Sequence, residues 1–339
     1  MALPRASCLL VAAIAACGAA VPQVPGKGGP AWIELTTAHF VVWTDAAEPR
    51  ARQLVREIEH LRQVVVGTAF RGANGSMKTW VIALRDDDER SAYVPGEFSA
   101  LASPPGGNLT GQPVIVLSAS SNVEASDRIE AHELVHAISH AVIPVQPRWF
   151  AEGMAKYYET VELGDGTADL GRAPDDHGRP IVIHHLEPVQ KIFACQTLAC
   201  TDITFYATAW ALFTYLTNAH PEQLAAYEAA LVATRDPERA WQSAFAGVSL
   251  DQLDQDLRHW LVEGKHQVLH FKVALEEPAP AVRPLGDADV YAVRAFMTYE
   301  FIGDHARVQR DLDAALALDA GNALAAKVKT AMSAPASRP

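Results

Sequence analysis

The stretch Arg128-Ile-Glu-Ala-His132-Glu133-Leu-Val-His136-Ala-Ile-Ser-His140 contains the pattern His-Glu-x-x-His. On a helix, residues four apart lie on one face, so His132 and His136 can aim both imidazoles at one metal ion. Glu133 is displaced by about 100° around the helix axis, where a carboxylate can take a proton from metal-bound water. The competing interpretation is two core or surface histidines that lie one turn apart by coincidence. Features elsewhere in the chain must distinguish a metal site from this coincidence.

Length and composition indicate an ordinary globular protein. The chain has 339 residues, enough for one large domain or two smaller ones, and 49% of them are hydrophobic. The formal net charge of −12 argues against nucleic acid and against anionic membrane surfaces as partners. No segment after the N-terminus is long and apolar enough to cross a bilayer.

The N-terminus has the pattern of an export signal. A single basic residue precedes the small and apolar run Ala6–Ala16, which is too short to span a membrane but fits a signal peptide over residues 1–16. Ile14-Ala-Ala-Cys17 resembles the bacterial lipobox, which implies a lipid on Cys17, and Gly18 after it implies the outer membrane, facing the periplasm. Residues 17–30 then form a tether. The alternative is cleavage after Ala20, which would give a soluble secreted or periplasmic protein.

The remaining cysteines fit an oxidising compartment. Cys8 leaves with the signal peptide and Cys17 carries the lipid, so Cys195 and Cys200 remain close together in the sequence. We expect a local disulfide between them. A zinc knuckle is the alternative, but the chain has no second cysteine pair to complete it.

Hydrophobic periodicity predicts an α+β fold in which strands come first and helices follow. Val94–Gln112 and Leu163–Arg179 are rich in Gly, Pro or Asp and predict loops, the first of them a long mobile loop that could act as a lid. The predicted strands are Trp32–Leu35, His39–Thr44, Thr79–Leu84 and Pro113–Ser118. The predicted helices are Pro49–Val66, one from about Ser126 or Asp127 to Ile143, Phe150–Val161, Thr204–Leu216, Pro221–Val232, Pro237–Ala246 and Leu250–Val262.

Residues 285–333 form a helical tail distinct from the preceding domain, residues 31–275. Three short amphipathic helices are predicted over Asp289–Ile302, Ala306–Leu318 and Ala323–Met332. The segment from Gly303 resembles part of a tetratricopeptide repeat, of which only about one copy is present, so a full solenoid is excluded. The tail could cap the preceding domain or bind a protein partner, and capping is the interpretation we favour.

A third metal ligand is available in Trp149-Phe-Ala-Glu152-Gly-Met-Ala155. Together with His-Glu-x-x-His, this segment resembles the gluzincin zinc metallopeptidases. The resemblance implies that Glu152 is the third zinc ligand, that Gly153 and Ala155 allow close helix packing, and that Trp149 and Tyr157 wall the site. Ala151 stands where the family usually has Asn, and only fifteen residues separate His136 from Glu152.

Other residues are weaker candidates for the third metal ligand. Metzincins need Gly and His at positions 139 and 142, where this chain has Ser139 and Val142. His140 lies on the same helical face as the two ligands, but a packed or supporting role is more common for such a residue. Glu159 is a second-choice carboxylate ligand. The cluster Asp175-Asp-His177 is expected to be solvated loop charge.

The resemblance implies a hydrolytic mechanism. Zinc activates a water molecule, Glu133 acts as the general base, and a peptide carbonyl is attacked. A further donor must stabilise the oxyanion, for which Tyr206 is the first candidate and His184 or His185 the second. The strand at Pro113–Ser118 could bind an extended peptide along a sheet edge, or it could be an interior strand.

Three functions are compatible with the sequence. The first is a zinc metallopeptidase of the bacterial cell envelope that cleaves peptide or protein substrates. The second is a lipid-anchored assembly protein that keeps the fold without catalysis and binds partners through its tail. The third is zinc-dependent hydrolysis of something other than a peptide. The intact Glu133 favours an enzyme, because a purely structural metal site needs no base.

Overall fold

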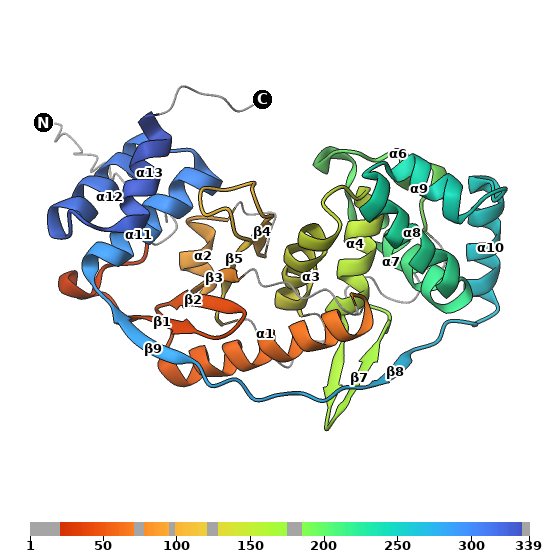
Figure 1. Cartoon of the computed structure of the whole chain (residues 1–339), viewed down its shortest axis with the longest axis horizontal. Coiled ribbons are helices and arrows are strands. Elements are labelled where there is room, and N and C mark those ends of the chain that lie inside the picture. Colours follow the sequence, from red (N-terminus) through yellow and green to blue (C-terminus); the bar gives the residue numbers. More distant parts are fainter. Residues whose placement is uncertain (1–20, 71–77, 95–98, 121–127, 175–184, 334–339) are drawn as a thin grey trace, which may run out of the picture.

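The computed structural model describes residues 21–70, 78–94, 99–120, 128–174 and 185–333. Within these ranges the fold is α+β, as predicted, and its centre is a mixed sheet of six strands. In chain order they are β1 (Trp32–Thr36), β2 (Phe40–Thr44), β3 (Thr79–Leu84), β4 (Leu101–Ser103), β5 (Val114–Ser118) and β9 (Ala281–Leu285). They lie side by side in the order β4-β5-β3-β2-β1-β9 (Figure 1). Strands β2, β3 and β5 are parallel, and the other pairings are antiparallel.

Both faces of this sheet are buried, which explains why its parallel strands are nearly continuous apolar runs. Successive residues of a strand point to opposite faces. Val42 and Val81 therefore face a core that includes helix α1 (Glu48–Thr68), while Trp43 and Ile82 face a second core on the other side.

The helical tail covers that second face. Its helices are α11 (Asp287–Met297), continued by the π-helical turn η3 (Thr298–Ile302), α12 (His305–Leu318) and α13 (Ala323–Ser333). The prediction of three tail helices is thus confirmed. Val290 and Phe296 of α11 are fully buried in the same core as Trp43 and Ile82. Sheet and tail therefore share one hydrophobic core.

The prediction that all strands precede the helices is wrong, because further strands follow α10 (Leu250–Val262). The chain leaves the last helix before the tail, runs beside α1, and returns to the sheet as β9 (Figure 1). Gln63 of α1 exchanges two hydrogen bonds with the backbone of Glu276 on this return. On the way β8 (Leu269–Lys272) joins a small antiparallel sheet with β6 (Glu162–Gly164) and β7 (Thr167–Leu170). The loop predicted over Leu163–Arg179 therefore begins with a hairpin, and its residues 175–179 lie outside the described ranges.

The segment predicted as a mobile loop over Val94–Gln112 contains β4. Because β4 is at the end of the sheet, β5 is an interior strand. Of the two roles considered for the strand Pro113–Ser118, the interior one is therefore correct. Before this segment, the acidic run at residues 86–89 begins the short helix α2 (Asp87–Ser91), which Asp86 caps through the Glu89 N–H.

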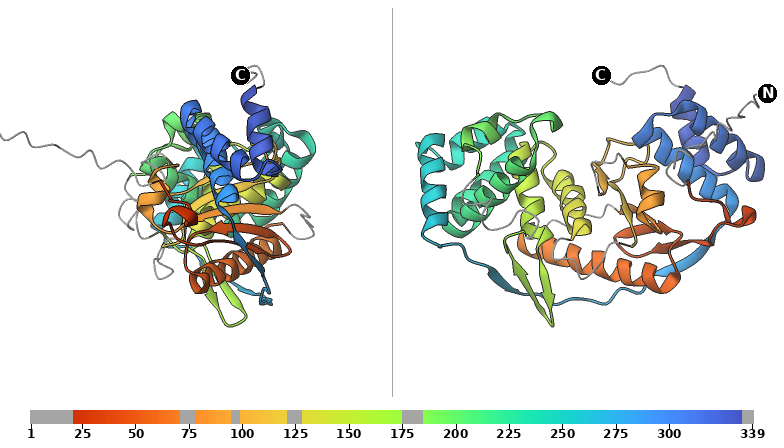
Figure 2. Two further views of the ribbon diagram at one scale, coloured as in Figure 1. Left: turned by 90° about the vertical axis from the view of Figure 1, so that its left-hand side faces the viewer. Right: turned by 180° about the vertical axis from the view of Figure 1, so that it is seen from behind.

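Helices α3 (Ile129–Val142) and α4 (Arg148–Glu159) carry the two motifs and are joined by the tight turn that the prolines predict. They lie between the sheet with its tail and a group of helices at the opposite end of the molecule (Figure 2). That group comprises α6 (Val189–Ala194), α7 (Ile203–Ala219), α8 (Pro221–Thr234), α9 (Pro237–Ala244) and α10 (Leu250–Val262), with the 3₁₀ turn η2 (Leu198–Cys200) before α7. The expected disulfide between Cys195 and Cys200 is present at that turn.

The N-terminal segment is packed from its first described residues. Val24 is buried, and the Pro22 carbonyl accepts a hydrogen bond from Arg294 of α11. The 3₁₀ turn η1 (Pro25–Lys27) follows, and the Gly26 N–H donates to Asp287. Residues 22–26 of the expected tether therefore lie against the tail, while the signal peptide and Cys17 lie outside the described residues. Among the described helices, none combines the length and apolarity needed to span a membrane.

Close packing of α4 on α7 depends on Gly153, a position at which the family resemblance implies close helix packing. A Cβ at this position would lie 2.5 Å from the Ala209 carbonyl oxygen and 3.0 Å from the Phe213 Cβ, and both atoms belong to α7. Because one contact is with backbone, the two helices would have to separate.

We expect Gly153→Ala to lower the free energy of unfolding by about 1–3 kcal/mol through overpacking. Urea denaturation monitored by circular dichroism would measure the change. Gly67→Ala on α1 is the matched control, because an added Cβ there meets no atom within 4 Å. That substitution should be neutral or stabilise by up to about 1 kcal/mol. Equal effects of the two substitutions would contradict the packing explanation.

Candidate metal centre

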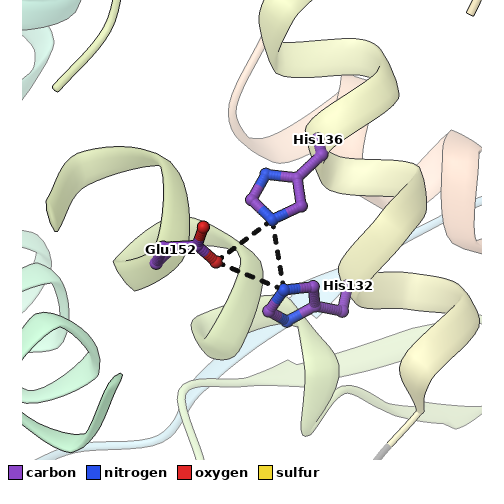
Figure 3. A group of neighbouring side chains, drawn as sticks. All are labelled: His132, His136 and Glu152. Carbon is purple, nitrogen blue, oxygen red and sulfur yellow. Dashed lines mark hydrogen bonds and ion pairs between the residues drawn. The ribbon is translucent and has the colours of Figure 1, made fainter. Parts of the chain in front are cut away.

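His132, His136 and Glu152 bring three ligand atoms together between α3 and α4 (Figure 3). The Nε2 atoms of the two histidines are 3.1 Å apart, and Glu152 Oε2 lies 3.4 Å from His132 Nε2 and 3.2 Å from His136 Nε2. Ligands held tetrahedrally at about 2.0–2.1 Å from a zinc-sized ion lie about 3.3–3.4 Å from one another. The three residues therefore form a possible metal-binding group, as the two sequence motifs predict.

Glu159 stands behind His132 and is not a ligand in this arrangement. Its Oε2 is 2.7 Å from His132 Nδ1, and its Oε1 accepts a hydrogen bond from Lys156 at 2.8 Å. A proton on Nδ1 leaves the Nε2 lone pair free to face the metal position, which is the usual arrangement for a ligand histidine. Burial alone would raise the pKa of Glu159, but His132 and Lys156 outweigh it and the pKa is lowered.

Arg148 holds the other oxygen of the Glu152 carboxylate. Its Nη2 donates to Glu152 Oε1 at 2.9 Å, one helical turn away on α4. Burial raises the pKa of Glu152, but the imidazoles of His136 and His132 outweigh it, and the pKa lies well below the usual value. Sequence reasoning missed Arg148, although its position four residues before Glu152 is a recognisable pairing signal.

Glu133 opens into the same pocket as the three ligands. This pocket has a volume of about 370 Å³. Burial raises the pKa of Glu133, and the neighbouring imidazoles offset this only in part. A carboxylate with a raised pKa holds a proton more readily than an ordinary one, which suits a group that accepts and returns a proton.

The rest of the pocket comes from β4 and from α3, α4 and α7. Tyr206 is on its wall, so the structure brings this candidate to the site, and burial raises its pKa, which keeps the hydroxyl a donor at neutral pH. His140 also lines the pocket but is not in the metal-binding group; burial and His136 lower its pKa to about 4. His185 is exposed and does not line it, and His184 is outside the described residues.

Trp149 and Tyr157 do not wall the site, contrary to the expectation from the family resemblance. Trp149 is buried and stacks on Phe193 and Tyr227, and Tyr157 packs on Phe213. Both side chains belong to the core between α4 and the helices beyond it.

No protein-family model matches the chain, and no curated protein matches it. The similarity to gluzincins therefore rests on the residues between His132 and Ala155. What supports a function is the arrangement of this chain's own side chains.

Proposed function

We propose that the chain is a zinc-dependent metallopeptidase of the gluzincin type. The observation that carries the proposal is the convergence of His132, His136 and Glu152 on one point, with Glu133 in the same pocket. Two nitrogen ligands and one carboxylate oxygen are a ligand set of catalytic zinc sites, which keep a fourth position for water. A structural zinc site would use four protein ligands, whereas the group found among the described residues has three.

The residues of the pocket suit hydrolysis of a peptide bond. Zinc, when bound, lowers the pKa of water to about 7 and polarises a carbonyl group. Glu133 would accept the proton of the attacking water and pass it to the leaving amine. Glu159 would keep His132 in the correct tautomer and orientation. Tyr206 would donate a hydrogen bond from its hydroxyl group to the oxyanion that develops on the substrate.

The free edge of β4 supports an extended peptide as the substrate. Among the described residues β4 pairs only with β5, so the other edge of β4 is unoccupied there. Leu101 and Ala102 of this strand line the pocket. A peptide that adds to a sheet edge gains backbone hydrogen bonds whatever its sequence, and its alternate side chains enter pockets. Adding a peptide to β4 would bring its backbone beside the metal ligands.

We further propose that the protein is exported and works in the cell envelope. The Cys195–Cys200 disulfide fits an oxidising compartment. The signal-like residues 1–16 and a lipid on Cys17 would supply export and a membrane anchor.

Purified protein should contain about one zinc ion per chain. It should cleave members of a broad peptide library, and a chelator should abolish cleavage until zinc is restored. Elemental analysis and mass spectrometry of the digest provide the two measurements. Protein without bound metal after zinc incubation, or cleavage that survives chelation, would contradict the proposal.

Tyr206→Phe should lower kcat by about 10²–10³-fold while the zinc content stays unchanged, since it removes only a donor to the oxyanion. Tyr215→Phe on the same helix is the control, because Tyr215 pairs with His220 and does not line the pocket. Steady-state kinetics on one cleaved peptide would compare the two variants. An unchanged kcat in Tyr206→Phe would remove this residue from the mechanism.

A further inference from the structure

The two oxygens of the Glu152 carboxylate have different partners. Oε2 faces the two histidines, at 3.4 Å from His132 and 3.2 Å from His136. Oε1 points to Arg148 and accepts a hydrogen bond from its Nη2 at 2.9 Å. One oxygen is therefore placed for a metal ion and the other is held by a cation.

This division matters because a carboxylate can bind a metal ion through one oxygen or through both. If both oxygens of Glu152 bound, a site of two histidines and one glutamate would already have four ligand atoms. The fourth position of a tetrahedral catalytic site is the one that water needs. A hydrogen bond to an ionised carboxylate oxygen is among the stronger ones, so it can determine which oxygen faces the metal.

The Arg148–Glu152 ion pair can hold one carboxylate oxygen in place better than an ordinary surface ion pair can. Arg148 and Glu152 are one turn apart on α4, and their side chains are 24% and 9% exposed. The helix fixes the spacing of the two side chains, and partial burial reduces screening by water. A guanidinium is a planar group with directed donors, whereas a lysine ammonium is a mobile point charge on a flexible stem.

We propose that Arg148 is a positioning residue that makes Glu152 a one-oxygen ligand and so preserves the position for water. The proposal rests on the metal centre of the proposed function. It goes beyond that function because it assigns the coordination number of the bound ion to a residue that is not a ligand.

The test uses the full-length protein and two substitutions, Arg148→Met and Arg148→Lys. Zinc affinity is measured by competition with a chromophoric chelator, and the apo-proteins are loaded with Co²⁺ for visible absorption spectra. Four-coordinate Co²⁺ absorbs more strongly than five- or six-coordinate Co²⁺. Arg52→Met is the matched control, since it breaks an exposed pair with Glu48, also four residues apart, on α1.

We expect Arg148→Met to bind zinc about 10- to 100-fold more weakly, and its Co²⁺ absorption to fall as the second oxygen of Glu152 binds. Arg148→Lys should restore part of both signals, and Arg52→Met should match the wild type. Arg148→Met with wild-type zinc affinity and Co²⁺ spectrum would overturn the role of Arg148 and leave the metallopeptidase standing. Wild-type protein that binds neither ion would overturn both. If Arg148→Met does not fold, as judged by circular dichroism, Arg148→Lys against the wild type decides by the same two measurements.

Discussion

Glu133→Gln should lower peptide hydrolysis by about 10²–10⁴-fold while zinc binding stays intact. Glutamine has nearly the same shape as glutamate but cannot accept the proton of the attacking water. Glu133 is not in the metal-binding group, so the ligand atoms of His132, His136 and Glu152 are unaffected by the change. Rates on one cleaved peptide, together with the zinc content of the same sample, would measure both effects.

Glu130→Gln is the control for this substitution. Glu130 is also buried on α3, but it does not line the pocket. Burial raises the pKa of its carboxyl group, so a neutral glutamine is a mild replacement there. The control variant should keep most of its activity. Wild-type activity in Glu133→Gln would exclude the catalytic role of Glu133, whatever the metal content.

Glu159→Ala should lower the free energy of unfolding by about 3–5 kcal/mol, the largest effect on stability that we expect of a single substitution near the site. Glu159 accepts from Lys156 through one oxygen and pairs with His132 through the other, and its own side chain is only 4% exposed. The substitution removes the buried carboxylate that pairs with both His132 and Lys156. Urea denaturation in the presence of chelator isolates this effect from metal binding.

Two further variants separate stability from metal affinity. Glu159→Gln keeps the size of the side chain but loses its charge, and it should weaken zinc binding by about 10- to 100-fold with a smaller loss of stability. Glu162→Ala breaks an exposed ion pair with Arg172 and should cost at most about 1 kcal/mol. If Glu159→Ala is no more destabilising than Glu162→Ala, the buried pairing does not support the fold.

The three residues of the possible metal-binding group could be predicted because their spacing follows directly from helix geometry. His132 and His136 are one turn apart, and Glu152 lies in a second motif whose helix pairs with the first. The partners behind the ligands were harder to predict, although Glu159 is seven residues from Glu152 and so lies on nearly the same side of α4. Whether such a residue binds the metal or supports a ligand depends on how α3 and α4 are placed, and no pattern within one helix fixes that.

The strands that the sequence analysis missed are short and carry weak signals. β4 has only three residues. β9 contains Pro284, and a proline has no N–H to donate between strands, so it argues against a strand except at the edge of a sheet. The hairpin of β6 and β7 is a different case, because Asp165-Gly166 between them is a strong two-residue turn signal within the segment predicted as a loop. Gly166 has a positive φ of 70°, a backbone conformation that glycine adopts without steric cost.

The return of the chain to the sheet has a consequence for folding during synthesis. Arg283 on β9 binds Glu34 on β1, although 249 positions separate them in the sequence. A chain that is still being made lacks β9 and α11–α13, so the sheet face that carries Trp43 and Ile82 has nothing to cover it. Contacts between such distant segments form slowly, because a long loop must close first. This face of the sheet is therefore covered only after β9 and α11–α13 have been made.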